Sequence, residues 1–501
     1  MTEYATIING RDVCLSGRTF NAQSPFYPEY SVDIADSGAE DIRTAISYAT
    51  SMSARSMLRN IPFKQLKQIL DDAADRIHFT DEDEEHCVRM MGVPRKWIRN
   101  YMMQVPAALR AITRDVQSRY DHTDGLIGRM YDGGRFEFKE PRNGFMYSIV
   151  PSNDPRATNF VLMCSILGRT PAVLKVSKNE ISVSRKVVHA LVEAGYPPQA
   201  ISMLCWDTTD RMAALEKHAQ VCQAASVIIP FGSDDTVDET LRYFSRQRLD
   251  EGELRKYTGQ VLDERILQAA QVTEKIDLFS GKDLRHTTGN CAIIVDEGVS
   301  AETAAKLITY SAYHYPISCK AGKAVYTVGE RQDIVEAVAE LASCLEVSDP
   351  LGETTEIGYV DEETLDAVIQ NSEMKLRHGQ LRSHAEIQRI SPHQSTPMLF
   401  STQDIASPFL EQEISVYLAT FLAAPSLEAA IAACNKGNRG KKRLAVSVLS
   451  PNALPATFLQ SINANQIHRN LPTNNLHGSI HQGVNYVEAL SRTQSIIGAA
   501  P

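Results

Sequence analysis

Short apolar runs alternate with longer amphipathic ones from about residue 145, and this alternation constrains the fold more than any other feature of the sequence. The stretch 182–195 places Val187, Val188 and Leu191 on one helical face and ends at Gly195, a residue suited to a helix C-terminus. Strands separated by helices form right-handed crossovers, which predicts a parallel sheet. The expected elements of this block are the strand AVLKVS, the helix SVSRKVVHALVEAG, the strand AISMLCW, the helix RMAALEKHA, the strand ASVIIPFGS and a helix from DDTVDETLRYF.

A second alternating block begins near residue 286. Between the blocks, residues 254–282 are polar and poor in strand signals, so we expect the chain to cross from one domain to the next there. The expected elements of the second block are the strand CAIIVD, the helix SAETAAKLITYSAY, the strand KAVYTV and the helix RQDIVEAVAELASCL. The sequence therefore predicts an α/β fold with two parallel-sheet domains.

Length, charge and cysteine usage narrow the class of protein. A chain of 501 residues is long enough for two or three domains. The formal charge of −10 provides no basic field for nucleic acid, and the acidic run at residues 80–85 predicts a solvated helix start. We see no secretory signal and no apolar run near about 18 residues, so we expect no membrane span. The 9 scattered cysteines, without a C-x-x-C pair, favour a reducing cytoplasm over a disulfide framework or a zinc site.

The two commonest phosphate-binding loops, G-x-G-x-x-G and G-x-x-x-x-G-K-[ST], are absent from the sequence. One strand instead ends in Phe231, Gly232 and Ser233 and runs into a predicted helix, where free N–H groups and a hydroxyl could hold a pyrophosphate. Taken alone, this turn is more simply interpreted as an ordinary connection between a strand and a helix than as a pyrophosphate site.

Several short segments between about residues 135 and 450 follow one another in a characteristic order. They are PSNDP (151–155), VLKVSKNEISVS (173–184), EAGYPPQAI (193–201), FGS (231–233), HTTGNCAIIVD (286–296), SCKAGKAVYT (318–327) and EQEISVYL (411–418). In this order and at these gaps they resemble the aldehyde dehydrogenase superfamily, although any one of them alone is unspecific.

The resemblance implies two Rossmann-like α/β domains and a small oligomerisation arm, with the active site between the domains. We expect a dinucleotide-binding domain with the N-terminal region in residues 1–270, a catalytic domain in 271–450 and the C-terminal segment with the arm in 451–501. The implied cofactor is NADP, with NAD as the alternative. The implied partners are a small aldehyde or acyl thioester, coenzyme A or an acyl carrier protein, and further copies of the chain in a homodimer or homotetramer.

The resemblance also implies that Cys319 is a covalent nucleophile. A thiolate is the reactive form of cysteine, and a neighbouring cation such as Lys320 can lower a thiol pKa. Asn153 matches the asparagine whose amide, together with the backbone N–H of the cysteine, stabilises the oxyanion of the adduct. The alternatives are a buried structural thiol, which is the interpretation for the other cysteines, and a loop cap between two prolines for Asn153.

Cofactor contacts are carried over from the same segments. Glu413 matches the residue that holds the nicotinamide ribose, with a surface glutamate as the alternative. Lys178 stands where NAD-preferring relatives have an acidic residue, which favours a 2′-phosphate unless its side chain points to solvent. The residues assigned to the dinucleotide, apart from Glu413, are Pro151, Lys175, Ser177, Lys178, Phe231, Gly232 and Ser233.

One departure from the family pattern concerns the acyl acceptor. His286 occupies the position of the usual general base, a glutamate that activates water in hydrolytic members. Gly289 and Asn290 resemble the branch that passes the acyl group to a thiol, so we favour acyl-thioester chemistry. Two alternatives stay open: aldehyde oxidation to an acid with His286 as base, and an inactive relative that acts as a binding protein.

Weaker signals have simpler interpretations. His477 and His481 are spaced as metal ligands on a helix would be, but a surface loop is the better interpretation. The basic run 436–443 reads as a solvated loop rather than a phosphate site, and we expect His314 to pack between Tyr313 and Tyr315 rather than tune the thiol. The 53-residue interval from Ser233 to His286 is longer than the family norm and helical in pattern, with no role assigned.

Overall fold

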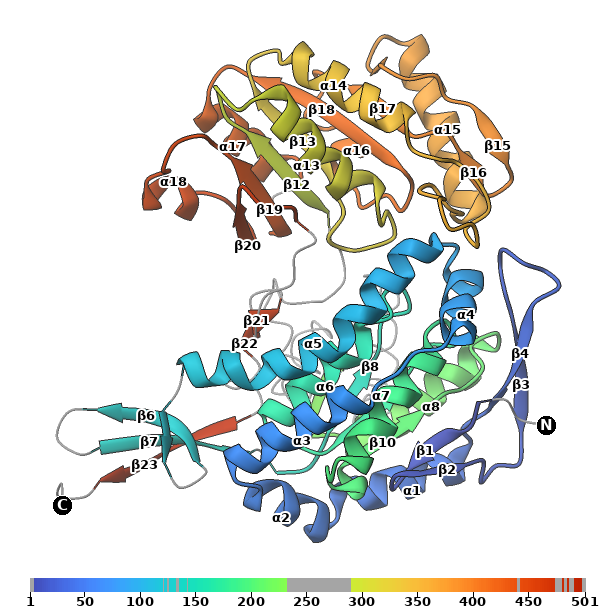
Figure 1. The fold of residues 1–501 in the computed structure, drawn as a ribbon, viewed down its shortest axis with the longest axis vertical. Coiled ribbons are helices and arrows are strands. Elements are labelled where there is room, and N and C mark those ends of the chain that lie inside the picture. Colours follow the sequence, from blue (N-terminus) through green and yellow to red (C-terminus); the bar gives the residue numbers. More distant parts are fainter. Residues whose placement is uncertain are drawn as a thin grey trace, which may run out of the picture.

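The computed structural model describes residues 4–119, 121–123, 126–131, 135–141, 143–231, 290–438, 442–473, 480–481, 484–485 and 491–497. These residues form two α/β lobes, one above the other in Figure 1, and an arm of strands that projects from the lower lobe. The expected helix from DDTVDETLRYF and the interval from Ser233 to His286 lie outside the described residues.

The first lobe is built on a six-stranded sheet in the order β11-β8-β9-β10-β1-β2. The four strands β11, β8, β9 and β10 are parallel, and β1 joins β10 in the antiparallel direction. The chain steps from β8 to β9 to β10 and then returns to the far side of β8, so the strand order reverses between β8 and β11. The strands are β1 (Thr6–Ile8), β2 (Arg11–Val13), β8 (Met146–Ile149), β9 (Ala172–Lys175), β10 (Ile201–Leu204) and β11 (Val227–Pro230).

Helices cover both faces of this sheet, as crossovers between parallel strands require. The helix expected at residues 182–195 is α7: Val187, Val188 and Leu191 are buried, and Gly195 ends it at a φ of +102° that favours glycine. The remaining elements of the lobe are the hairpin β3 (Thr19–Gln23) and β4 (Ser31–Ala35), α1 (Ala39–Thr50), α2 (Met52–Asn60), α3 (Phe63–Arg76), α4 (Asp81–Met91), α5 (Arg95–Arg119), α6 (Ala157–Leu167), α7 (Ile181–Glu193), the short 3-10 helix η1 (Pro198–Ala200) and α8 (Arg211–Ala224).

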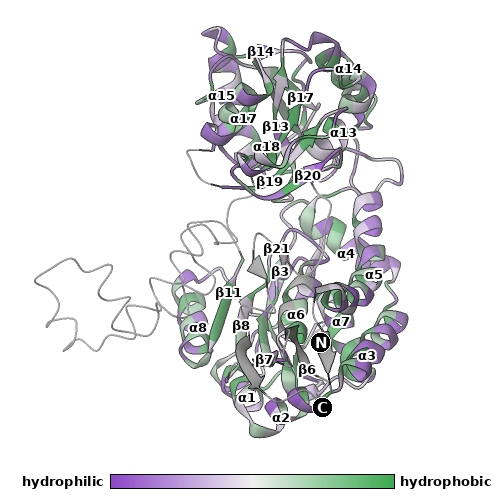
Figure 2. Cartoon of the chain, turned by 90° about the vertical axis from the view of Figure 1, so that its left-hand side faces the viewer, coloured by the Kyte–Doolittle hydropathy of each residue, from purple (hydrophilic) through white to green (hydrophobic). Residues whose placement is uncertain are grey.

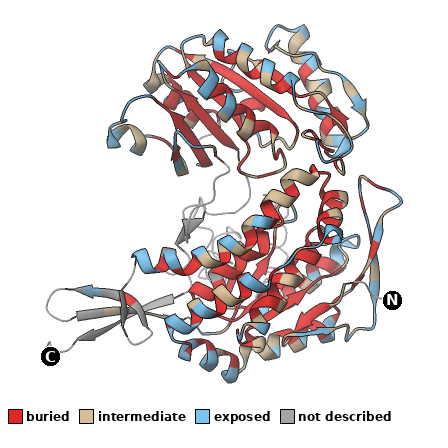
Figure 3. Cartoon of the chain, viewed as in Figure 1, coloured by how far each residue is buried: buried red, intermediate tan, exposed pale blue. Residues whose placement is uncertain are grey.

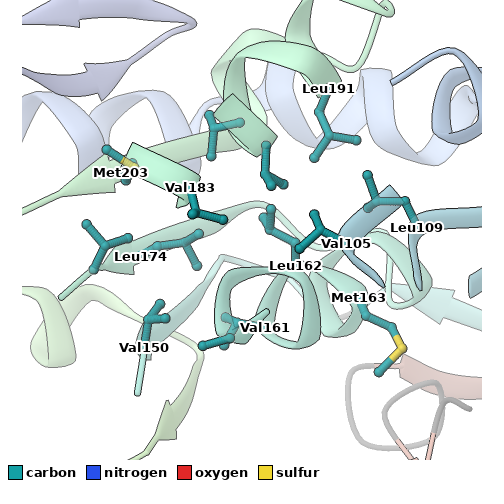
Figure 4. Close-up of a cluster of buried hydrophobic side chains, with 14 of the residues drawn as sticks. Val105, Leu109, Val150, Val161, Leu162, Met163, Leu174, Val183, Leu191 and Met203 are labelled. Carbon is teal, nitrogen blue, oxygen red and sulfur yellow. The ribbon is translucent and has the colours of Figure 1, made fainter. Parts of the chain in front are cut away.

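The core of the first lobe lies between the sheet and helices α5, α6 and α7. Figure 4 shows Val105 and Leu109 of α5 beside Leu162 of α6, with Leu174 of β9 to the left of them. All four side chains are fully buried, and each contributes about 1.5–3 kcal/mol relative to an exposed position. Figure 2 shows the same distribution along the ribbon, with apolar residues on the strands and hydrophilic ones on the outer sides of the helices.

The acidic run at residues 80–85 does begin a helix, α4, but it is not wholly solvated as expected. Thr80 and Asp83 form a reciprocal capping box at the amino end. Asp83 is buried and pairs with Lys186, while Glu84 is buried and pairs with Arg99 at 2.8 Å. These two carboxylates therefore form ion pairs with residues of α5 and α7. Such pairing cannot be predicted from the number of charges in the run.

The second lobe has a seven-stranded sheet in the order β14-β17-β18-β13-β12-β19-β20, parallel except at β14. Every residue of β12 and β19 is buried, as for strands covered on both faces (Figure 3). The strands are β12 (Cys291–Val295), β13 (Gly322–Val328), β14 (Arg382–Ser383), β17 (Met398–Ser401), β18 (Leu418–Ala424), β19 (Arg443–Leu449) and β20 (Ala464–Arg469), with the small pair β15 (Arg389–Ser391) and β16 (Gln394–Ser395) beside them. The helices are α13 (Ala301–Tyr313), α14 (Gln332–Ser343), α15 (Glu362–Arg377), α16 (Pro408–Glu411), α17 (Leu427–Lys436) and α18 (Ala456–Gln460).

The arm combines segments from distant parts of the chain. Its order is β23-β7-β6-β5, and β23 pairs with β7 from Ser491 opposite Pro141 to Ile497 opposite Arg135. The C-terminal segment thus leaves the second lobe and returns to the arm of its own chain (Figure 1). The elements are β5 (Asp121–Thr123), β6 (Leu126–Tyr131), β7 (Arg135–Pro141) and β23 (Ser491–Ile497), with the hairpin β21 (Ile480–His481) and β22 (Val484–Asn485) on the way.

The expected architecture of two parallel-sheet α/β domains and an arm is confirmed. Among the described helices, none combines the length and apolar character that a bilayer crossing requires.

Candidate active site

Cys319 lies in the loop between α13 and β13, residues 314–321, which we call the cysteine loop. Thr473, beyond β20, donates from Oγ1 to the Lys320 carbonyl at 2.6 Å and so holds the loop against the sheet. Gly322 follows the loop, and a Cβ atom there would lie only 2.9 Å from Oγ1 of Thr473. The close approach of the Thr473 side chain therefore favours glycine at the start of β13.

Asn153 reaches the cysteine loop from the other lobe. It follows β8, and its Nδ2 donates to the Ile317 carbonyl at 2.7 Å, two residues before Cys319. The alternative of a purely local loop cap is therefore wrong, because the amide bonds to a residue of the opposite lobe. Within the described part of the chain, only one N–H of the amide is used, which leaves the other for a further acceptor.

Cys319 itself is half-buried, in a setting that is largely apolar. It packs against a small cluster formed by Cys291, Leu444 and Ala445. The Sγ of Cys291 lies 3.4 Å from the Cys319 carbonyl.

The thiol pKa of Cys319 is raised to about 12, chiefly by burial and further by the nearby Glu413 carboxylate. Lys320 acts in the expected direction and lowers it, but the effect is too small to prevail. Lys320 is itself buried, which lowers its own pKa to about 8, and its Nζ bonds to Oε1 of Gln466 at 3.1 Å. Lys320 alone therefore does not make the resting thiol acidic, because desolvation outweighs the effect of one partly neutral amine.

Glu413 lies in the loop between α16 and β18, residues 412–417, which we call the Glu413 loop. Asn290 clamps the residues before it, since its Nδ2 donates to the Glu411 carbonyl at 2.7 Å and the Leu410 carbonyl at 3.4 Å. Behind it, the buried Tyr417 hydroxyl accepts from the Gly358 N–H at 2.8 Å. Asn290 therefore has a structural task here, apart from its place in the resemblance to the thiol-acylating branch.

Arg443 corrects the interpretation of the basic run 436–443 as a solvated loop. Its side chain is fully buried at the start of β19. The guanidinium donates to the Tyr326 hydroxyl and to the carbonyls of Asn290, Leu410, Cys434 and Gly437. This one arginine thus connects several segments behind the Glu413 loop by hydrogen bonds. The sequence of the basic run does not distinguish it from the neighbouring lysines and arginine.

Sequence reasoning also missed the pair Asp154 and Arg156. Arg156 is buried, donates to Asp154 at 2.6 and 2.9 Å, and lies 3.6 Å over the ring of Tyr101. Tyr101 stacks on Tyr315 of the cysteine loop at 4.5 Å. This stack ties the first lobe to the cysteine loop beside Asn153, and its only signal in the sequence is the adjacency of the two charges to that asparagine.

His314 packs, as expected, but not against Tyr313 and Tyr315. Its ring stacks on Trp97 at 4.1 Å and meets the edge of Tyr310 at 4.6 Å. Burial lowers its pKa to about 4, so the imidazole is neutral at pH 7. The helical period of α13 places Tyr310 beside His314, and α5 supplies Trp97.

The dinucleotide residues lie at the carboxyl edge of the first sheet. Pro151 and Phe231 follow β8 and β11, the two strands between which the order reverses, and crevices of this kind bind nucleotides in open α/β sheets. The half-buried Lys175 ends β9; burial lowers its pKa, and no hydrogen-bond partner for its Nζ lies within the described residues. A lysine amine without such a partner is suited to bind a ribose hydroxyl or a phosphate.

The turn after β9 is held by buried groups. Ser177 donates its N–H to Glu180 at 3.3 Å and accepts from the Asn179 N–H at 3.1 Å. The Lys178 carbonyl accepts from Nε2 of His86 at 2.9 Å, and its Nζ lies 3.4 Å from the Gln23 carbonyl. Three assigned residues, Gly232, Ser233 and His286, lie outside the described residues, as does His477.

The comparisons agree with this geometry. Residues 14–245 match the model of the aldehyde dehydrogenase family. The fold is similar to an NAD-dependent aldehyde dehydrogenase from Sinorhizobium meliloti, with a TM-score of 0.76 and 17% identity over 99% of this chain and 95% of that one. It is also similar to an NADP-dependent glyceraldehyde-3-phosphate dehydrogenase from Bacillus halodurans, solved with NADP, with a TM-score of 0.74 and 16% identity over 99% of each chain.

A salicylaldehyde dehydrogenase from Pseudomonas putida gives a TM-score of 0.75 and 13% identity over 99% of this chain and 98% of that one. No curated protein matches the sequence. By sequence, residues 14–245 are therefore similar to the aldehyde dehydrogenase family, and along its described length the chain has the fold of these aldehyde dehydrogenases.

Proposed function

We propose that the chain interconverts an aldehyde and an acyl thioester through a covalent bond to Cys319, with thioester reduction as the working direction. The observation that carries this proposal is the hydrogen bond from Asn153 to Ile317, which brings an amide donor of one lobe to the nucleophile's loop in the other. Glu413 is close enough to raise the pKa of the same thiol. The three groups proposed as nucleophile, oxyanion donor and ribose-binding carboxylate therefore belong to neighbouring segments at the junction of the lobes.

In this direction the Cys319 sulfur attacks the carbonyl carbon of the incoming thioester. The leaving thiol takes up the proton that Cys319 loses, so the exchange of one thioester for another needs no net acid or base. When bound, the reduced nicotinamide supplies a hydride to the same carbon. The resulting hemithioacetal oxyanion then breaks its carbon–sulfur bond, which releases the aldehyde and leaves a Cys319 thiolate that takes up one proton from solvent.

Asn153 and the Cys319 N–H are assigned to the oxyanion that forms at both stages. Preorganised donors of this kind are each worth about 2.7–4 kcal/mol of transition-state stabilisation. Asn153 fits this role because its bond to the Ile317 carbonyl fixes the amide beside the loop.

Two features support a thiol rather than water as the acyl partner. His286 replaces the glutamate that activates water in hydrolytic relatives. The apolar packing of Cys319 against Leu444 and Ala445 keeps water away from the thioester.

We further propose a preference for NADP(H). Lys175, Ser177 and Lys178 place charge and donors at the carboxyl end of β9, where relatives that prefer NAD have an acid. The arm, with its C-terminal strand β23, is proposed to join copies into a dimer or tetramer, and the domain limits near residues 270 and 450 are kept as part of this proposal.

The test uses the purified chain with NADP⁺ or NAD⁺ and a panel of aldehydes, with and without coenzyme A, and the reverse reaction with acyl-coenzyme A and NADPH. Reduction of NADP⁺ that depends on the thiol supports the proposal, and thiol-independent reduction means oxidation to the acid. Intact-protein mass spectrometry after acyl-coenzyme A is expected to show one acyl group on the wild-type chain.

A matched pair of variants completes the test. Cys319→Ser is expected to lose the adduct and at least 10³-fold in kcat, whereas Cys344→Ser, at an exposed cysteine, is expected to keep both. A Cys319→Ser variant as active as the wild type would refute the covalent mechanism. A chain that catalyses neither aldehyde oxidation nor thioester reduction would favour the alternative of a binding protein.

A further inference from the structure

Lys323 is a buried lysine at a break in the sheet. Its side chain is only 8% exposed. On the side of β12, Cys291 pairs with Gly322 and Ala292 pairs with Ala324, so Lys323 is the extra residue of a β-bulge and has no partner on that strand. Bulges of this kind turn a side chain away from the regular alternation of the strand.

The bulge directs the Lys323 amine to two loops at once. Its Nζ donates to the Pro316 carbonyl at 2.7 Å, within the cysteine loop. It also donates to the Ile414 carbonyl, next to Glu413. One amine therefore spans the loop that carries the nucleophile and the loop that carries the carboxylate.

We propose that Lys323 is a positioning residue that fixes the cysteine loop against the Glu413 loop and so sets the separation of the thiol from the carboxylate. The inference rests on the proposed function only in treating these two groups as parts of one active site. An apolar residue would fill the same space without the desolvation of an amine, so the two carbonyls are the reason for a lysine here.

The effect of the positive charge on Lys323 can be measured separately from the effect of its hydrogen bonds. Burial lowers its pKa to about 7, with Glu413 opposing the shift, so at pH 9 the amine is neutral yet still has two N–H groups for the two carbonyls. A change in thiol behaviour at pH 9 and above then reports the geometry of the loops rather than the loss of a positive charge.

The experiment compares Lys323→Met with Thr327→Val. Thr327 is also a buried polar residue of β13, but its hydroxyl donates to the Gly329 carbonyl at 2.9 Å, at the opposite end of the strand. The rate of iodoacetamide labelling is measured from pH 7 to 11, with Cys319 located by peptide mass spectrometry and folding checked by near-ultraviolet circular dichroism. The kcat and KM for the active substrate pair are measured alongside.

Between pH 9 and 11, Lys323→Met is expected to raise the rate of Cys319 labelling about tenfold, as a fall of one unit in the thiol pKa would, because water enters the loosened loops. The same variant is expected to lower kcat at least tenfold with little change in KM. Thr327→Val is expected to match the wild type, and Lys323→Arg, which keeps the donors, to lie nearer the wild type than Lys323→Met. If Lys323→Met does not fold, Lys323→Gln is measured in its place, with the same expected direction.

An unchanged labelling profile in a folded Lys323→Met or Lys323→Gln protein would overturn the inference. Labelling needs no substrate, so it decides the role of Lys323 even if the proposed reaction fails. Conversely, a wild-type chain that is inactive towards every aldehyde and thioester overturns the proposed function alone.

Discussion

The contact of Asn153 with Ile317 shows, at the scale of single residues, how much one side chain can do at this site. The amide restrains the cysteine loop, and within the described residues its second N–H has no acceptor, which suits the proposed contact with an oxyanion. A residue with this double task is sensitive to truncation, because its loss removes a donor and releases a loop. The sequence predicts the chemistry of this residue, while the bond to the opposite lobe appears only in the structure.

Replacing this asparagine gives the first prediction. Asn153→Ala is expected to lower kcat/KM by about 10²- to 10³-fold, the range found when one oxyanion donor is removed. Asn435→Ala is the matched control, because Asn435 also donates to a backbone carbonyl, that of Ser461 at 2.8 Å, but lies at the end of α17. A loss below threefold for Asn153→Ala would rule out the oxyanion role.

Glu180 provides a prediction of pH dependence at the same scale. Burial raises the pKa of its carboxyl to about 7. Between pH 4.5 and 7 the folded chain holds a proton that the unfolded chain releases, so this group makes the protein less stable as pH rises, by roughly 3 kcal/mol in all. Glu180→Gln, which stays neutral, is expected to remove that decline. Urea unfolding at pH 5.5 and 8 measures it, and an unchanged difference between the two pH values would contradict it.

At the scale of elements, the four-residue helix α16 is too short to hold itself in place. Asn290 and Arg443 hold it instead, by bonding to carbonyls at its end, and the Glu413 loop begins directly after it. Short helices gain their stability from such tertiary contacts rather than from their own hydrogen bonds. The position of Glu413 therefore depends on Asn290, directly before β12, and on Arg443, the first residue of β19.

Removing one of these clamps gives a prediction for the element. Asn290→Ala leaves carbonyls of Leu410 and Glu411 without this donor, and is expected to cost about 2–3 kcal/mol of unfolding free energy. Because the Glu413 loop loosens, affinity for NADP⁺ is expected to fall severalfold. Urea unfolding and calorimetric titration measure the two effects. The control is Asn21→Ala, whose bonds to Ser31 and Asp33 are exposed and should cost under about 0.5 kcal/mol.

At the scale of the whole molecule, the lobes meet at a polar junction as well as at the site. The amino end of α5 contacts the second lobe through the Arg95 N–H, which donates to the Pro350 carbonyl at 2.8 Å, and through ion pairs of Lys96 with Glu356 and Arg99 with Glu353. An exposed pair such as Arg99 with Glu353 contributes little, about 0–1 kcal/mol. Stability of the first lobe is set more by its buried groups.

Two buried histidines lower the stability of the first lobe at acid pH. Burial lowers the pKa of His86 to about 4 and of His218 to about 3, so both are neutral when folded. Between pH 6.5 and about 4 the unfolded chain binds protons that the folded chain does not, so stability falls as pH falls, by about 3 kcal/mol for each histidine. Together they outweigh the opposite effect of Glu180.

The fluorescence of Trp206, whose ring meets His218 edge-on at 4.9 Å, is a suitable probe of this transition. The urea midpoint is expected to be lower at pH 5 than at pH 7.5, and His218→Gln is expected to reduce the difference. An equal midpoint for the wild type at both pH values would show that these histidines do not control acid stability.

The order of strands and helices and the glycine that ends α7 could be predicted from the sequence, because periodicity and short motifs are local properties. The roles of Cys319, Asn153 and Glu413 come from the same short motifs and stay predictions. The raised thiol pKa, the burial of Arg443 and Asp83, the partners of His314 and the two-loop contact of Lys323 could not. Each depends on which groups surround a side chain once distant segments pack together, and desolvation and hydrogen bonding across the fold then outweigh the charge and spacing that the sequence displays.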